Sequence, residues 1–373
     1  MADAHYRNFL SWLLLKRGFE RQFIVPPSPP AWAERFLSWY ERRVMTIDLA
    51  GITIDRPIFL IGIHRSGTTV LQDLMCLHPH VAFINNSMPT FRHCFCAAER
   101  LRKRLRLHVR GERVLHDGVE VATDSPNEGV VFWQEWLKED PHDLTCVRRR
   151  IEDFTPAEIE KIYTAIKKVL WCYDGKANRF FCKNPRLLPH LLLLKDLFPD
   201  AKFIHIVRDA RQCANSMVKL YRLEQAQLDF IRRTGGHGVY DEKPFISFPR
   251  LPRLKEYVET YGPDSIETTA RLWNDAIDEV NRVRDHLPAF CEVRFEDFVR
   301  SPRAHIERLF EFCELPPIEP ENKRFWEKLR GVREPSSPSS YAHFDRITEI
   351  CRENLERYGY LSDASAAKPP HAR

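Results

Sequence analysis

One segment constrains the fold of this chain more than any other: an apolar run, Pro57 to Ile63, that leads into a glycine-containing turn and then at once into a helical pattern. An unbroken apolar run of this length is typical of a strand buried on both faces of a parallel sheet. The helical pattern begins at about Thr68, where Leu71 and Leu74 recur on one helix face. A buried strand followed directly by a helix favours an α/β fold.

A second unit of the same kind lies further along the chain. Residues 202–207 form another apolar run, and helical patterns precede it at 187–198 and follow it at 211–221. Strands that alternate with helices in this way predict one α/β domain with a parallel sheet. The chain has 373 residues, 43% hydrophobic and 29% charged, which is the composition of a globular protein with enough chain to bury a large core.

The first part of the chain is predicted to be a helical extension of the main domain. Helical periodicity covers 6–23 and 31–45, and a proline-rich stretch separates the two. Their apolar side chains either pack on the main domain or lie on a membrane or a partner. These side chains include Trp12, Leu13, Trp32 and Phe36.

We therefore expect three parts: a helical extension (1–55), one main domain (56–361) and a flexible tail (362–373). The apolar run 9–15 is too short to cross a bilayer, so no transmembrane span is expected. The ten cysteines include no Cys-x-x-Cys pair, which favours free thiols, a cytoplasmic location and no metal site.

Positive charge is concentrated in one segment, residues 92–113. It contains eight Arg or Lys against Glu99 and Glu112, a local charge of +6, while the whole chain is only +5. So small an overall surplus argues against a nucleic-acid partner. The segment is either a solvated helix face, with Leu101, Leu105 and Leu107 on the inner side, or an electrostatic guide for an acidic substrate or a membrane surface.

The turn after the first strand has the form of a phosphate-binding loop. It reads Gly-x-x-x-x-Gly-Thr-Thr over residues 62–69, between a buried strand and a helix N-terminus, where backbone N–H groups bind anions. Thr68 replaces the lysine of nucleotide-triphosphate loops, and a cation stands inside the loop as Arg65. Transfer of a γ-phosphate is therefore disfavoured. The alternative is an ordinary connection in which Ser66 caps the helix and Gly67 only turns.

Arg208 and Ser216 follow the second strand and suggest a second anion site. Arg208 lies at the carboxyl edge of the predicted sheet, where ligands of open α/β sheets bind, and Ser216 lies two helical turns further on. A guanidinium and a hydroxyl at this edge suit a phosphate. The alternative for Arg208 is a structural salt bridge with Asp209 or another carboxylate.

The two motifs together resemble the sulfotransferase superfamily, whose sulfuryl donor is 3′-phosphoadenosine 5′-phosphosulfate (PAPS). The similarity extends over about Ile58 to Pro302 and is closest to bacterial, carbohydrate and tyrosylprotein members. It implies a three-layer P-loop-type fold with a central parallel sheet, and 3′,5′-adenosine bisphosphate as product. It also implies that Arg208 and Ser216 bind the 3′-phosphate. The residues implied for the 5′-phosphosulfate are Arg65, Ser66, Gly67, Thr68 and Thr69.

The resemblance leaves the catalytic base open. Cytosolic members place a histidine where this chain has Pro185, and tyrosylprotein members place a glutamate where it has Asn85 and Asn86. Bacterial members often have an Asp-Ser-Pro-x-Glu segment, which here is 124–128, so Glu128 is the candidate base. The alternative is that this segment only caps a helix over 127–138. The reserve candidates are His93 and His116.

The expected reaction is metal-independent transfer of a sulfuryl group to a hydroxyl or amine. Arg65 and Lys183 are expected to stabilise the charge that develops, while Glu128 takes the acceptor's proton. The acceptor is a small molecule, a lipid or a saccharide, and the sequence fixes neither its identity nor the oligomeric state. Two other functions remain open: a P-loop small-molecule kinase, and a non-catalytic nucleotide-binding protein that acts through its basic segment.

Overall fold

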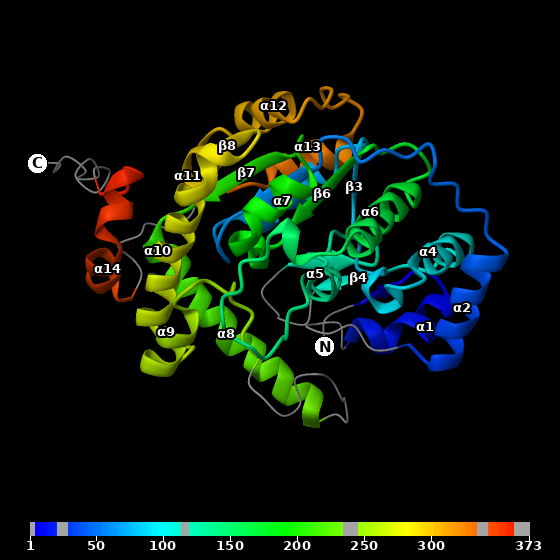
Figure 1. Cartoon of the computed structure of the whole chain (residues 1–373), viewed down its shortest axis with the longest axis horizontal. Helices are drawn as coiled ribbons and strands as arrows, with labels where there is room; N and C mark the ends of the chain where they lie inside the picture. The colour runs from blue at the N-terminus through cyan, green and yellow to red at the C-terminus, as the bar shows by residue number, and fades with distance from the viewer. Residues whose placement is uncertain (1–3, 21–28, 113–118, 234–244, 334–341, 362–373) are drawn as a thin grey trace, which may run out of the picture.

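The computed structural model describes residues 4–20, 29–112, 119–233, 245–333 and 342–361. At its centre lies a sheet of five parallel strands in the order β3-β6-β2-β7-β8 (Figure 1). The strands are β2 (Ile58–Ile61), β3 (Val81–Phe83), β6 (Arg179–Lys183), β7 (Lys202–Val207) and β8 (Phe290–Arg294).

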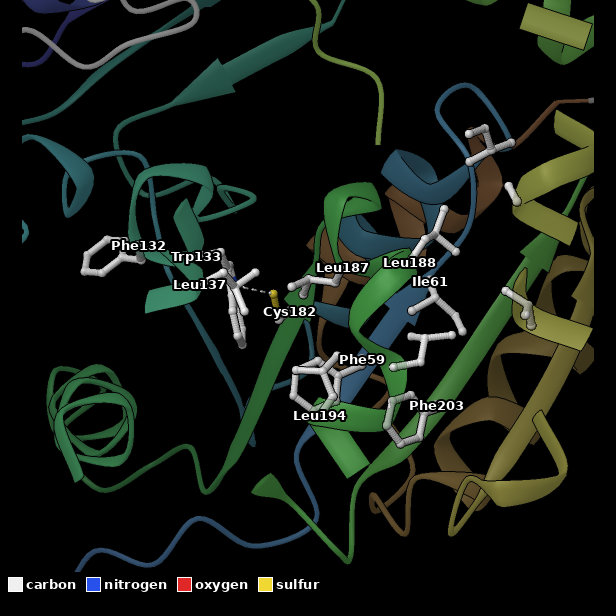
Figure 2. Packing of buried hydrophobic residues seen from close by; sticks show 14 of the residues in the cluster. Phe59, Ile61, Phe132, Trp133, Leu137, Cys182, Leu187, Leu188, Leu194 and Phe203 are labelled. Carbon is white, nitrogen blue, oxygen red and sulfur yellow. Dashed lines mark hydrogen bonds between the residues drawn. The ribbon is translucent and has the colours of Figure 1, made fainter. Parts of the chain in front are cut away.

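Helices cover both faces of this sheet, so the expected three-layer α/β fold is confirmed. Alternate residues of β2 separate the two cores: Phe59 and Ile61 belong to one, Ile58 and Leu60 to the other. Figure 2 shows the first core, in which Phe59 and Ile61 lie with the helical side chains on one face of the sheet. All four β2 residues are buried, as the unbroken apolar run predicts.

Along the chain, helices lie between successive strands of the central sheet, and further helices follow its last strand, β8 (Figure 1). They are α1 (Phe9–Glu20), α2 (Ala31–Arg43), α3 (Thr68–Met75), α4 (Phe95–Arg104), α5 (Val130–Leu137), α6 (Pro156–Trp171), α7 (Leu191–Leu197), α8 (Ala210–Arg233), α9 (Leu254–Tyr261), α10 (Ile266–Val283), α11 (Phe295–Arg300), α12 (Pro302–Phe312), α13 (Lys323–Arg330) and α14 (Phe344–Arg357).

Two helix boundaries differ from the sequence-based expectation. In place of one helix over 187–198, the structure has a 3₁₀ helix, Pro185–His190, followed by α7. The 3₁₀ helix forms because Pro185 and Pro189 supply no N–H for regular α-helical bonding. Helix α8 continues to Arg233, well beyond residue 221. The inner face of the added turns is formed by Glu224, Gln227 and Leu228, and the two polar residues among them interrupt the apolar period that marks a helix in the sequence.

A second, three-stranded sheet joins the N-terminus to the middle of the chain. Its antiparallel strands are β1 (His5–Tyr6), β4 (Val109–Glu112) and β5 (Glu120–Ala122), in the order β1-β4-β5. Tyr6 therefore lies in a strand and not in the helix expected from residue 6, whereas α1 and α2 confirm the two helices themselves. None of the described helices is both long and apolar enough to span a lipid bilayer.

The basic segment is not one helix face with its leucines inside. Helix α4 ends at Arg104, and the chain then enters β4. Leu107 is buried, but Leu101 is 42% exposed, so the expectation of an inward Leu101 is wrong. The inner face of α4 is formed instead by residues nearer its start, such as Phe95 and Ala97.

Candidate functional site

The candidate site lies where three neighbouring strands end. Leu60 of β2 pairs with Lys183, the last residue of β6, and Ile61 pairs with His205 of β7. The loop 62–67, Lys183 and Arg208 therefore emerge at the same carboxyl edge of the sheet. This is the edge at which open α/β sheets bind their ligands.

The loop over residues 62–67 is shaped by Gly67 and by the contact of this glycine with Phe295, which follows β8. Gly67 has φ +95° and is the N-cap of α3, a conformation that favours glycine. A Cβ atom at this position would lie 2.2 Å from Phe295 Cδ2, so no larger residue fits. The Ser66 hydroxyl donates to the Ile63 carbonyl (2.7 Å) and does not cap the helix, which contradicts the alternative that Ser66 is a simple cap.

The two motifs that are expected to bind anions meet in space. Arg65 Nε donates to Ser216 Oγ over 2.8 Å, although these residues are 151 positions apart. Arg208 Nη1 donates to the Arg65 carbonyl over 3.2 Å. Since Ser216 Oγ accepts from Arg65, its own proton is free to be donated to an anion.

Arg208 keeps its positive charge available. Its Nε donates to the Gln212 side-chain carbonyl (2.8 Å), and its guanidinium lies 4.6 Å from the centre of the Phe295 ring. No carboxylate forms an ion pair with it within the described ranges, because Asp209 pairs with Arg211 instead. The alternative of a structural salt bridge at Arg208 is therefore wrong, and a cation held by neutral groups suits an anionic ligand.

Lys183 and Glu128 form an ion pair beside the loop. Lys183 Nζ donates to Glu128 Oε1, and the lysine side chain is 5% exposed while that of the glutamate is 33% exposed. A nearly inaccessible ammonium and a reachable carboxylate thus share one hydrogen bond. Such a pair can take up a proton at one group and stabilise negative charge at the other.

The segment that holds Glu128 is fixed by the segment of Asn85 and Asn86. Asn86 N donates to the Ser125 carbonyl (3.0 Å), and the side-chain amide of Asn127 donates to Asn86 Oδ1 (2.9 Å). Asn127 N donates to the Ile84 carbonyl just before them (2.8 Å). The chain after β3, where tyrosylprotein members are expected to have their base, therefore lies against the segment that supplies Glu128.

The alternative in which 124–128 caps a helix over 127–138 is wrong in its details. Helix α5 begins only at Val130, and its N-cap is Gly129 with φ +65°. Ser125 Oγ accepts from Ala122 N (2.9 Å), away from the helix. Glu128 precedes the N-cap and lies against Lys183, so its carboxylate is not in the first turn of the helix.

His64 lies inside the loop and was not singled out by the sequence analysis. Its pKa is lowered from 6.5 to about 4, mainly by burial; Glu128 opposes this shift, and Lys183, Arg186 and Arg65 contribute to it. Its Nδ1 is buried without a hydrogen-bond partner in the described part of the chain. A neutral imidazole therefore faces the charged groups of the site. The sequence shows a histidine beside Arg65, but it does not show that this side chain is buried, because burial depends on tertiary packing.

The residues after β8 support the loop from behind, a role that the sequence analysis did not assign to them. Glu296 Oε1 accepts from Asp209 N (3.2 Å), and Tyr360 donates to Glu296 Oε2 (2.8 Å). Burial raises the pKa of Glu296, although these hydrogen bonds oppose the shift. Together with Phe295, this short segment positions both the loop glycine and the chain around Arg208.

Two of the proposed site residues lie at the start of α3, and His93, one of the two reserve bases, does not lie beside them. Thr68 is buried and Thr69 half-buried in the first turn of α3. His93 is about half exposed and lies 3.9 Å from Glu135 on the outer side of α5. His116 lies outside the described residues, as does the tail 362–373.

Comparison with known proteins gives matches over most of the chain. A sequence model described as "Sulfotransferase family" matches residues 57–241 and 248–320. Omega-hydroxy-beta-dihydromenaquinone-9 sulfotransferase Stf3 of Mycobacterium bovis and that of Mycobacterium tuberculosis are each 23% identical over 343 residues, covering 86% of this chain and 79% of theirs. The crystal structure of sulfotransferase STF9 from Mycobacterium avium superposes with a TM-score of 0.52 at 18% identity, over 83% of this chain and 78% of that one.

Proposed function

This chain belongs to the sulfotransferase family, and from that premise we propose that it transfers a sulfuryl group from PAPS to a hydroxyl and releases 3′,5′-adenosine bisphosphate. The observation that supports this proposal most is the contact between Arg65 and Ser216. It joins the loop assigned to the 5′-phosphosulfate with the pair assigned to the 3′-phosphate. A donor with two separate anionic groups fits one connected site of this kind.

The donor is held from two sides in this proposal. The loop amides with Thr68 and Thr69 bind the 5′-phosphate at the N-terminus of α3, where the helix dipole favours an anion. Arg208 and the Ser216 hydroxyl bind the 3′-phosphate. Gln212 and Phe295 keep the Arg208 guanidinium in place without neutralising it.

The transfer itself uses Glu128, Lys183 and Arg65. Glu128 accepts the proton of the acceptor hydroxyl, and the hydroxyl oxygen forms the new bond to sulfur. The bond between sulfur and the bridging oxygen breaks, and its electron pair goes to the 5′-phosphate. Lys183 and Arg65 stabilise the charge that grows on the bridging and sulfuryl oxygens. Every step is a proton or group transfer among the donor, the acceptor and these residues.

We propose a hydroxyl on a lipid-like molecule as the acceptor class. Support comes from the two mycobacterial relatives, whose names give a hydroxylated dihydromenaquinone as their substrate. The partial exposure of the Glu128 side chain leaves its carboxylate reachable for such a hydroxyl.

Ligand binding tests the donor assignment without knowledge of the acceptor. Thermal unfolding is measured with 3′,5′-adenosine bisphosphate and, in parallel, with ATP and magnesium. A ligand that binds only the folded state at 100 times its Kd stabilises it by about 2.7 kcal/mol, so the bisphosphate should raise the melting temperature clearly. Stabilisation by ATP with magnesium but not by the bisphosphate would favour a kinase and contradict the proposal.

A further inference from the structure

The N-terminal helices present an unusually apolar surface, which we call the outer aromatic surface. Most large apolar side chains that are exposed in the described residues belong to these two helices. Phe9 is 71% exposed and Trp32 is 73% exposed. Isolated exposed apolar residues are normal, but a group of this size marks an interaction site. The surface consists of Phe9, Leu10, Trp12, Leu13 and Leu14 on α1 and Trp32, Phe36 and Trp39 on α2.

Helix α2 has two distinct faces. Trp32, Phe36 and Trp39 follow one another at helical spacing and form an outward stripe. The opposite face holds the buried Leu37 and Glu41. Glu41 accepts from Lys168 Nζ (2.6 Å) and from the backbone N–H of residue 97 (3.0 Å). The carboxylate of Glu41 therefore faces inward and is paired, while the aromatic rings face outward.

Helix α1 is held by polar contacts and not by its apolar side chains. Ser11 is its one fully buried residue with a described side chain, and Ser11 Oγ accepts from the backbone N–H of His108 (3.0 Å). Phe9 and Leu13 lie on the face opposite Ser11. The rings of Phe9 and Trp12 stack with their centres 5.8 Å apart. The protein thus fixes this helix with its apolar side turned away from the core.

Basic side chains adjoin the outer aromatic surface. Arg100, Arg104 and Arg106 are exposed on and just after α4, and none of them forms an ion pair within the described residues. The side-chain amide of Asn8, at the start of α1, donates to the carbonyls of Leu105 (3.2 Å) and Arg106 (3.4 Å). Figure 1 shows α1, α2 and α4 grouped together on one side of the molecule.

We propose that the outer aromatic surface and these three arginines form a docking site for an anionic lipid membrane. Tryptophan rings prefer the membrane interface, and arginines beside them bind anionic headgroups. Charge favours a membrane over a second copy of this chain, because two copies that face each other would bring their arginines together. Glu41 of α2 is turned inward and does not offset this repulsion. The proposal does not depend on sulfuryl transfer, and its test needs no activity.

The docking site is connected to the candidate site through the small sheet. Strand β1, just before α1, pairs with β4, and β4 pairs with β5. Strand β5 leads directly into the segment of Glu128. The segment of Glu128 therefore begins on the side of the protein that faces the membrane in this proposal. This arrangement suits an acceptor that comes from a lipid phase.

The test is co-sedimentation of the full chain with vesicles of phosphatidylcholine alone and of phosphatidylcholine with phosphatidylglycerol. We expect binding to the anionic vesicles and at least tenfold weaker binding to the neutral ones. The variant Trp32→Ser/Phe36→Ser/Trp39→Ser should lose binding to both. Val147→Ser, which removes an apolar side chain that is 44% exposed outside these helices, is the matched control and should bind as the wild type does.

A second variant tests the role of the three arginines, and sedimentation also tests whether the surface binds a second copy of this chain instead. Arg100→Ala/Arg104→Ala/Arg106→Ala should weaken binding to anionic vesicles about fivefold for each arginine, with little change on neutral ones. The same thermal melting temperature in all variants shows that they are folded. Wild-type protein that binds neither vesicle overturns the proposal. So does a concentration-dependent dimer that the aromatic variant abolishes, because the surface would then be an interface between copies.

Discussion

The buried ammonium of Lys183 is hydrogen-bonded to the more accessible carboxylate of Glu128 at the carboxyl edge of the sheet. The pair places a cation and a carboxylate next to each other beside the loop 62–67. The proposed reaction needs both at once, since the acceptor loses a proton while the leaving phosphate gains charge.

Glu128→Gln tests the base. The amide keeps the size and one hydrogen bond to Lys183 but cannot take a proton, so turnover should fall about 10²- to 10⁴-fold, the usual contribution of a general base. Affinity for 3′,5′-adenosine bisphosphate, measured by calorimetry, should stay the same. Glu135→Gln, on the outer side of α5 beside Arg92, is the control. Unchanged turnover in Glu128→Gln would leave the glutamate a purely structural role.

Arg208→Ala tests the 3′-phosphate site. Loss of one charge-assisted contact of about 1.5 to 3 kcal/mol should weaken binding of the bisphosphate roughly 10- to 100-fold. Binding of adenosine 5′-phosphosulfate, which has no 3′-phosphate, should hardly change. Arg222→Ala removes a 66% exposed arginine side chain of helix α8, which begins two residues after Arg208, and serves as control. Equal loss of affinity for both nucleotides would show that Arg208 does not contact the 3′-phosphate.

Gly67→Ala tests the contact between the loop and Phe295. Both Gly67 (φ +95°) and Gly175 (φ +70°) have positive φ, but only at Gly67 would a Cβ meet another atom, whereas Gly175 has open space. Gly175→Ala should cost the backbone strain alone, about 1 to 2 kcal/mol. Gly67→Ala should cost about 1 to 3 kcal/mol more through overpacking and should weaken donor binding. Denaturant unfolding measures the loss of stability in the two variants, and equal losses would refute the steric role of Phe295.

The pKa of His64 predicts a specific loss of stability in acid. The unfolded chain binds a proton at this residue near pH 6.5, but the folded chain does so only near pH 4. The unfolded state therefore binds more protons between these values, and stability must fall as the pH drops from 6.5 to 4, by roughly 3 kcal/mol in total.

His64→Asn is the comparison for this pH dependence. Carboxylates titrate in both proteins, so the free energy of unfolding is measured by denaturant at several pH values and the difference between the two proteins is taken. The wild type should lose more stability than the variant between pH 6.5 and pH 4. Parallel curves would mean that His64 titrates normally in the folded state.

The parts of the fold that follow from local chemistry could be predicted from the sequence. Unbroken apolar runs gave β2 and β7, and the loop between β2 and α3 followed from its glycines and its place between strand and helix. Helix periodicity also located α1 and α2. The division of the chain at residues 55 and 361 stays a prediction.

Features that depend on distant contacts could not be predicted. Nothing local shows that Phe295 closes on Gly67 or that Arg65 reaches Ser216, because these contacts join residues from separate strand–helix units. The short strand β1 was missed for a similar reason, since two residues have no detectable period and pair only once β4 is in place. The burial of His64 likewise exists only in the folded chain.

The proposed sulfuryl transfer is tested with sulfur-labelled PAPS. The wild type and Arg65→Ala are incubated with the labelled donor and with the polar and the lipid fractions of a cell extract, and labelled product is separated and counted. We expect label in the lipid fraction with the wild type and about 10²- to 10³-fold slower labelling with Arg65→Ala, the usual cost of removing one group that stabilises a developing charge. Label in no fraction, or equal rates in the two proteins, would contradict the proposed transfer.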